Sequence, residues 1–121
     1  MDAAYTVSEL SASQVDRAFP LASAADLAGN IDDWRLFCLD RLGQVDTAEE
    51  GEQVLVCLNP LGYLKGLYVI RTRKTHDGTV LEVPLHVVAS VVDEEGVRMA
   101  FQQKLDLMAA DKGCPRVEFG G

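Results

Sequence analysis

The stretch LHVVASVVDEEGVRMAFQQKLDLMAADKGCPRVEF, residues 85–119, decides the fold of this chain. It begins with an apolar strand and passes through an acidic turn into a helix. The apolar residues of that helix recur at spacings of four, four and three, which indicates one buried face: Val97, Phe101, Leu105 and Met108, with Ala100 between them. Residues 115–119 then alternate as a short strand. The stretch therefore predicts a helix that crosses over between two parallel strands.

The ends of this helix are marked by charge and by backbone preference. Its start carries Asp93, Glu94 and Glu95, which suit the positive end of the helix dipole. Its end carries Lys112 and Gly113, and glycine most easily takes the left-handed conformation that closes a helix. Both boundaries are therefore predicted from the sequence.

Upstream of this stretch, two helices and a run of strands are predicted. A capping box, Ser11 with Gln14, opens a first helix that Pro20 should kink or shorten. Asn30 opens a second helix, whose core anchor is Trp34. The segment 44–51 is polar and acidic and is predicted to be a loop.

Period-two alternation predicts the strands. Both faces of residues 52–58 are apolar, which indicates a central strand, and Gly66 in the next strand marks a bulge or a close approach. Asp77-Gly78 predicts a hairpin, and Pro84 must break or bulge the pairing of the strand that follows it. The predicted strands are 5–10, 52–58, 64–74, 79–92 and 115–119.

Composition limits the possible function classes. The 121 residues, 48% of them hydrophobic, suffice for a single domain spanning 1–121. A net charge of -8 disfavours nucleic acid and anionic membranes as partners. No apolar run is long enough to span a bilayer and the N-terminus does not resemble a signal peptide, so we expect a cytoplasmic protein.

Three cysteines stand far apart among apolar neighbours: Cys38, Cys57 and Cys114. Their odd number and spacing predict buried free thiols rather than disulfides. Because no C-x-x-C motif or Cys/His cluster accompanies them, no metal site is predicted.

Two segments carry a resemblance to a known family. The pattern DDWRLF, residues 32–37, and the ending AADKGCPRVEF, residues 109–119, resemble the second helix and the third-helix-to-fifth-strand ending of the GNAT superfamily of acyl-coenzyme A N-acyltransferases. The resemblance covers most of the chain. It implies an α/β (α+β) fold with a mixed, mainly antiparallel sheet and helices on both faces.

The resemblance also implies a cofactor, acetyl-coenzyme A or another acyl-coenzyme A. In the family, the end of strand 4 binds the pantetheine arm, which corresponds here to Val88, Ala89 and Ser90. An R/Q-x-x-G-x-G/A loop binds the pyrophosphate, and it falls on residues 93–98. Gly96, Val97 and Arg98 are thus its candidate contacts.

Within that loop only Gly96 matches the family pattern, and the charge is reversed. Asp93 stands where the family has arginine or glutamine, and two glutamates follow it. Carboxylates close to a pyrophosphate cost on the order of a few kcal/mol per close pair at an effective dielectric near 20. The alternative interpretation, in which these acids cap the helix dipole, explains them without any ligand.

Candidate catalytic groups are limited to Glu82 and His86, which we predict to lie on one face of the fourth strand. A carboxylate and a neutral imidazole there could deprotonate an amine, while the alternative is a half-exposed glutamate and a histidine satisfied by local hydrogen bonds. The family's general-acid tyrosine comes from a fourth helix, and no residue here matches it. His76 is predicted to face solvent beside the hairpin turn.

Two functions from different classes follow. One is a non-catalytic or regulatory GNAT-like domain that binds a partner, and the other is a small acyltransferase with non-standard cofactor binding. The sequence stops soon after the fifth strand, at Gly121, so we expect that strand's outer edge to be open and the protein to form a homodimer. The alternative is that Pro115 and Gly120-Gly121 keep this edge too short to pair.

Overall fold

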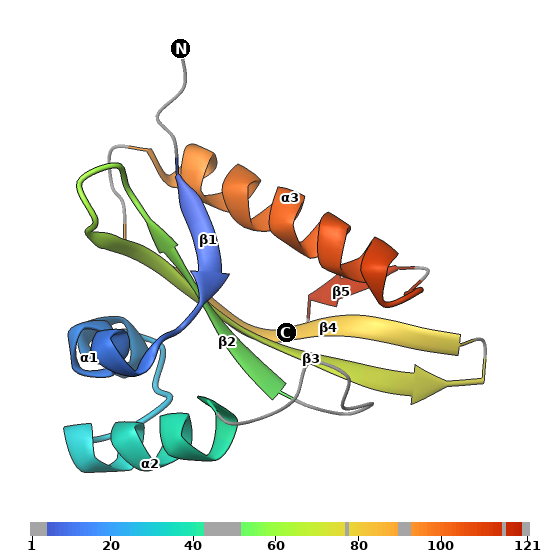
Figure 1. The fold of residues 1–121 in the computed structure, drawn as a ribbon. Coiled ribbons are helices and arrows are strands. Elements are labelled where there is room, and N and C mark those ends of the chain that lie inside the picture. Colours follow the sequence, from blue (N-terminus) through green and yellow to red (C-terminus); the bar gives the residue numbers. More distant parts are fainter. Residues whose placement is uncertain (1–4, 43–51, 77, 90–92, 115, 120–121) are drawn as a thin grey trace.

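The computed structural model describes residues 5–42, 52–76, 78–89, 93–114 and 116–119. A five-stranded sheet has the order β1-β2-β3-β4-β5. Its strands are β1 (Thr6–Glu9), β2 (Glu52–Leu58), β3 (Leu64–Thr75), β4 (Gly78–Val88) and β5 (Val117–Phe119). The helices are the short 3-10 turn η1 (Ala12–Gln14), α1 (Val15–Ala24), α2 (Ile31–Leu42) and α3 (Glu94–Asp111). Figure 1 shows α1 and α2 on one side of the sheet and α3 on the other.

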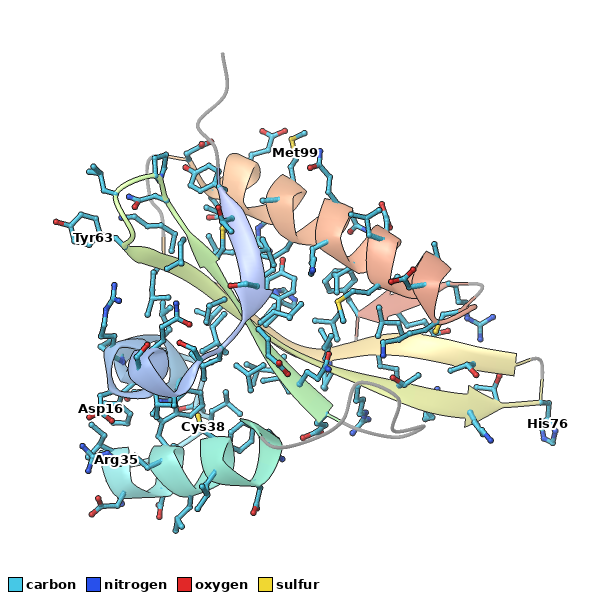
Figure 2. The ribbon with its side chains drawn as sticks, viewed as in Figure 1. Asp16, Arg35, Cys38, Tyr63, His76 and Met99 are labelled. Atoms are coloured by element: carbon cyan, nitrogen blue, oxygen red, sulfur yellow. The ribbon has the colours of Figure 1, made fainter. Side chains whose placement is uncertain are left out.

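Strand pairing confirms the predicted mixed sheet. β1 to β4 pair antiparallel with their neighbours, whereas β5 runs parallel to β4 after the α3 crossover. The hairpin predicted from Asp77-Gly78 is present, because Thr75 pairs with Gly78. Figure 2 shows His76 at its tip, pointing away from the molecule as predicted. Asp77 itself lies outside the described residues.

β4 carries the irregularity predicted at Pro84. Val69 pairs with Leu85 and Arg71 with Glu82, so Ile70 alone faces Val83 and Pro84. This is a β-bulge, and it fits a residue that has no amide hydrogen to donate. β4 runs to Val88, and residues 90–92 of the predicted strand lie outside the described residues.

The first part of the core lies between the sheet and the α1/α2 pair. Trp34 is fully buried there, and its Nε1–H donates to the Val15 carbonyl at 2.5 Å. The predicted cap of α2 is confirmed, because the Asn30 side chain accepts from the Asp33 amide at 2.8 Å. α1 runs through Pro20 to Ala24. The predicted loop 44–51 lies outside the described residues.

An ion pair joins α1 to α2 on their outer side. Arg35 donates from Nε and Nη2 to the two carboxylate oxygens of Asp16, at 2.9 and 2.8 Å. Figure 2 shows the two side chains facing each other across the gap between the helices. None of the described helices is long and apolar enough to cross a membrane.

The second part of the core lies between the sheet and α3. Phe101 is fully buried and stacks on Tyr68 with ring centroids 3.7 Å apart. The buried helix positions are Val97, Phe101, Leu105 and Ala109. The prediction is therefore correct for Val97, Phe101 and Leu105. At the last position the buried residue is Ala109, because the predicted Met108 is only partly buried.

Candidate functional site

The candidate site is the region where β4, β5 and the start of α3 meet. β5 pairs with β4 only over residues 81–83. Past that point β4 continues to Val88 with β3 as its one neighbour among the described strands. No described strand therefore pairs with the second edge of residues 84–88, beside the N-terminus of α3. A ligand's polar groups could pair with a free strand edge of this kind.

The Pro84 bulge separates the two predicted catalytic residues. Before the bulge, Leu81 and Val83 face α3, so Glu82 faces the α1/α2 side. After it, Leu85 packs on the α1/α2 side and His86 faces α3. The expectation that Glu82 and His86 share a face is therefore wrong, because the extra residue at the bulge reverses the alternation.

Glu82 is held by two arginines. Its carboxylate accepts from Arg71 Nε at 2.8 Å and from Arg73 Nε at 2.7 Å, and its side chain is only 13% exposed. The Arg71 hydrogen bond is the main cause that lowers the pKa of Glu82, with Arg73 adding to it. A carboxylate stabilised in this way is a weak base, and it is turned away from the α3 side.

These contacts belong to a row of alternating charges on the α1/α2 face of the sheet, which we call the arginine–glutamate ladder. It continues from Arg71 through Glu52 and from Arg73 through Glu118. The whole ladder, in order of contact, is Arg41, Glu52, Arg71, Glu82, Arg73, Glu118 and Arg116.

His86 lies in an aromatic setting on the α3 side. Its ring stands edge-on to Phe119 with centroids 5.4 Å apart and tilts against Tyr68 at the same distance. The residue is exposed. The Phe119 side chain of β5 thus packs against His86, the residue that was predicted as a candidate base.

The N-terminus of α3 is capped by a carboxylate of its own chain. Asp93 Oδ1 accepts from the Gly96 amide at 3.1 Å, and Asp93 Oδ2 accepts from the Tyr5 hydroxyl at 2.8 Å. That hydrogen bond is the main cause that raises the pKa of Tyr5. A Cβ at Gly96 would come within 2.7 Å of Asp93 Oδ1, so glycine is what lets the carboxylate lie on the helix end. The negative charge that the helix dipole favours is already in place.

Arg98, in the described first turns of α3, is also paired. Arg98 Nε donates to Glu94 at 2.9 Å, one turn earlier on α3. Burial raises the pKa of Tyr68, and the nearby Arg98 guanidinium opposes that rise. Glu95 is exposed beside them. The described residues at the start of α3 thus present three carboxylates and one arginine.

The three cysteines are buried free thiols, as predicted. Burial raises the pKa of Cys38 and of Cys57 to about 11 each, and it also raises the pKa of Cys114. Such thiols are inert as nucleophiles near neutral pH. Across the described part of the chain, no group of His, Cys, Asp and Glu side chains could hold a metal ion.

Solved structures resemble this arrangement although sequences do not. No protein-family model matches the chain, and no curated protein matches it. A GNAT family acetyltransferase of Staphylococcus aureus superposes with a TM-score of 0.77 at 10% identity, over 97% of this chain and 86% of that one. An aminoglycoside 6'-N-acetyltransferase of Acinetobacter baumannii gives 0.80 at 12%, over 98% and 80%. An aminoglycoside N-acetyltransferase solved in complex with coenzyme A gives 0.79 at 11%, over 100% and 79%.

The chain has the GNAT fold. This confirms the fold class expected from residues 32–37 and 109–119. Of the cofactor contacts implied by the resemblance, Val97 is fully buried in the core and Arg98 is paired with Glu94. Val88 is partly buried, Ala89 is exposed with its amide donating to the Lys65 carbonyl, and Ser90 lies outside the described residues.

A pyrophosphate does not fit the start of α3 as this GNAT fold presents it. The group would need the helix N-terminal amides, and the Gly96 amide is bonded to Asp93. It would also meet that carboxylate, at a cost of about 4 kcal/mol per pair of unit charges 4 Å apart at an effective dielectric near 20. The residues expected to hold the pyrophosphate therefore disagree with the chemistry of that group.

Two features of the site were not predicted from the sequence. Tyr5 bonds a carboxylate 88 positions away, and no local pattern indicates such a contact. The ladder depends on Arg71 and Arg73, which lie two positions apart on β3 and therefore on one face of it. Their glutamate partner could be inferred only from the register across the Pro84 bulge.

Proposed function

We propose that this protein is a non-catalytic GNAT-fold domain that acts by binding a partner, and that it does not use coenzyme A. The observation that carries the proposal is the Asp93 carboxylate on the N-terminus of α3, fixed by the Gly96 amide and the Tyr5 hydroxyl. It satisfies internally the positive helix end that would otherwise attract a phosphate.

The two candidate bases support the same proposal. Glu82 is paired with two arginines on the face of the sheet away from α3, so it does not lie beside the open edge of β4 as a free carboxylate. His86 lies on the α3 face, packed against Phe119. The two side chains therefore do not converge on one substrate position, which general acid–base catalysis requires.

A second function, a small acyl-coenzyme A N-acyltransferase, is favoured by one specific observation. Among the described strands none pairs with the second edge of β4 over residues 84–88, and a pantetheine arm could pair with its backbone. In this alternative the cofactor would be held by its pantetheine arm and acyl chain, with its pyrophosphate away from Asp93.

Calorimetric titration with acetyl-coenzyme A and with longer acyl-coenzyme A forms tests the proposal. We expect no heat of binding from the wild-type protein at millimolar ligand. A variant carrying Asp93→Ser, Glu94→Gln and Glu95→Gln should bind measurably, because serine still caps the helix while the three negative charges are gone. Arg98 is kept in this variant to favour the phosphate.

Tyr5→Phe is the matched control, since it removes the hydroxyl that holds Asp93 but leaves all charges in place. It should stay without binding. Wild-type binding with a micromolar dissociation constant would overturn the proposal and favour the acyltransferase. Equal binding by wild type and the triple variant would show that the carboxylates at α3 do not control the ligand.

A further inference from the structure

The outer edge of β5 is the edge opposite β4, and it carries backbone polar groups that point away from the sheet. The Leu81 amide donates to the Arg116 carbonyl at 3.3 Å, so Arg116 turns its backbone polar groups toward β4. The backbone N–H and C=O groups of successive residues point to opposite edges of a strand. Those of Val117 and Phe119 therefore point outward, away from β4. Among the described strands, none pairs with this edge. Such a row of donors and acceptors is a template for another strand.

The side chains of β5 carry a charge pattern that is complementary to itself. Arg116 and Glu118 are two positions apart, hence on one face, and bear opposite charges. They bond each other within the chain and end the arginine–glutamate ladder, with their side chains 53% and 40% exposed. Val117 lies between them on the other face, packed against the α3 side of the core.

We propose that β5 pairs antiparallel with β5 of a second copy of this chain, in the register centred on Val117. Arg116 then lies opposite the partner's Glu118, and Glu118 lies opposite the partner's Arg116. The Val117 amide donates to the carbonyl of the partner's Val117, and the amide of the partner's Val117 donates to the Val117 carbonyl. The ladder thereby continues across the two-fold axis into the second sheet.

Charge selects this register over its neighbour. A pairing centred on Glu118 also satisfies the backbone alternation. It would place that carboxylate directly opposite the partner's Glu118, at the closest approach that two strands allow, and like charges there are destabilising. The Val117-centred register instead forms two cross-strand ion pairs and sets two valine side chains together on the α3 face.

The strand is short, so the association is expected to be reversible. Two central backbone hydrogen bonds, two ion pairs and a valine contact make a small interface, in the class of transient complexes. The ion pairs are exposed, and added salt should therefore weaken the dimer. The pairing stands whether or not the domain binds coenzyme A.

Sedimentation velocity of the full chain across the micromolar range tests the pairing. The wild-type mass should rise from 13.2 kDa toward twice that value as concentration increases. Val117→Pro should hold the protein as a monomer, because proline removes the outward amide hydrogen, and Val117 is not the residue that turns toward β4. Val117→Thr, which keeps the amide and the branched side chain, should still dimerise.

A charge-swap mixture tests the register. Arg116→Glu and Glu118→Arg should each weaken self-association at least tenfold, since like charges then face each other. An equimolar mixture of the two variants should regain the dimer, because opposite charges face each other in the mixed pair. Circular dichroism confirms that each variant is folded, and the mixture remains informative even if Val117→Pro does not fold.

Three results would overturn the proposal. The first is a wild-type chain that remains a monomer at the highest concentration. The second is a dimer that Val117→Pro leaves unchanged, which would place the interface elsewhere. The third is two folded charge variants whose mixture does not associate, which would mean that Arg116 and Glu118 do not face each other across the axis.

Discussion

Gly66 determines how closely α3 packs on the sheet. A Cβ at this position would lie 2.7 Å from Phe101 Cε2 and 3.1 Å from Val97 Cγ1. The sequence marked Gly66 as a bulge or a close approach, and both are present. Cys57 pairs with Gly66 while Leu58 pairs with Leu64, so one residue of β3 is left over in the ladder.

Gly66→Ala should therefore destabilise the protein by about 1–3 kcal/mol, the usual cost of overpacking a core. Alanine also lowers the conformational entropy of the unfolded chain, which by itself would stabilise the protein by about 0.4–1 kcal/mol. The steric clash should outweigh this entropic gain, because Phe101 is fully buried and stacked on Tyr68 and cannot move away easily. Urea unfolding measures the change. Gly29→Ala is the control, since nothing lies within 4 Å of its Cβ and no loss is expected.

At the scale of elements, α3 is stabilised by its buried stripe. Phe101→Ala should lower the free energy of unfolding by about 3–5 kcal/mol, because it leaves a cavity against Tyr68 and Gly66. Leu107→Ala, on the same helix with 69% of the residue exposed, should change it by less than about 0.5 kcal/mol. Denaturant titration of both variants compares them directly. A loss below about 1 kcal/mol for Phe101→Ala would contradict the packing described for α3.

The elements themselves were largely predictable, whereas the site was not. β2 matched residues 52–58, the caps at Asn30, Asp93 and Gly113 were found where expected, and the hairpin formed. These features depend on neighbouring residues. The relative side of Glu82 and His86 depends on which β3 residue faces the Pro84 bulge, and only the paired strands decide that.

At the scale of the whole molecule, the arginine–glutamate ladder ties four strands and α2 together through side chains. Glu82 is central to it, and its pKa is lowered in the folded state from 4.5 by Arg71 and Arg73. A carboxyl group whose pKa is lower in the folded state than in the unfolded state stabilises the fold, and this stabilisation is fully present at pH values above the unfolded-state pKa. This stability is lost as the pH falls through the folded value.

Wild-type stability should therefore fall more steeply than that of Glu82→Gln as the pH is lowered from 6 through 4.5 toward 3. At neutral pH, Glu82→Gln should cost about 1 kcal/mol, since both arginines are about half exposed and water can replace the carboxylate. Thermal unfolding at each pH measures both effects. Glu9→Gln, at an exposed position on β1 outside the ladder, is the control substitution. Parallel profiles for wild type and Glu82→Gln would contradict the role given to Glu82.

The position of Trp34 has a consequence for watching this molecule unfold. It is the one tryptophan in the sequence, and it is fully buried between the sheet and the α1/α2 pair. Its fluorescence therefore reports on that layer alone, while ellipticity at 222 nm follows α3 together with the other helices. If the two signals change at the same denaturant concentration, the two layers unfold as one cooperative unit. An earlier fluorescence change would mean that the α1/α2 layer detaches from the sheet while α3 remains packed on it.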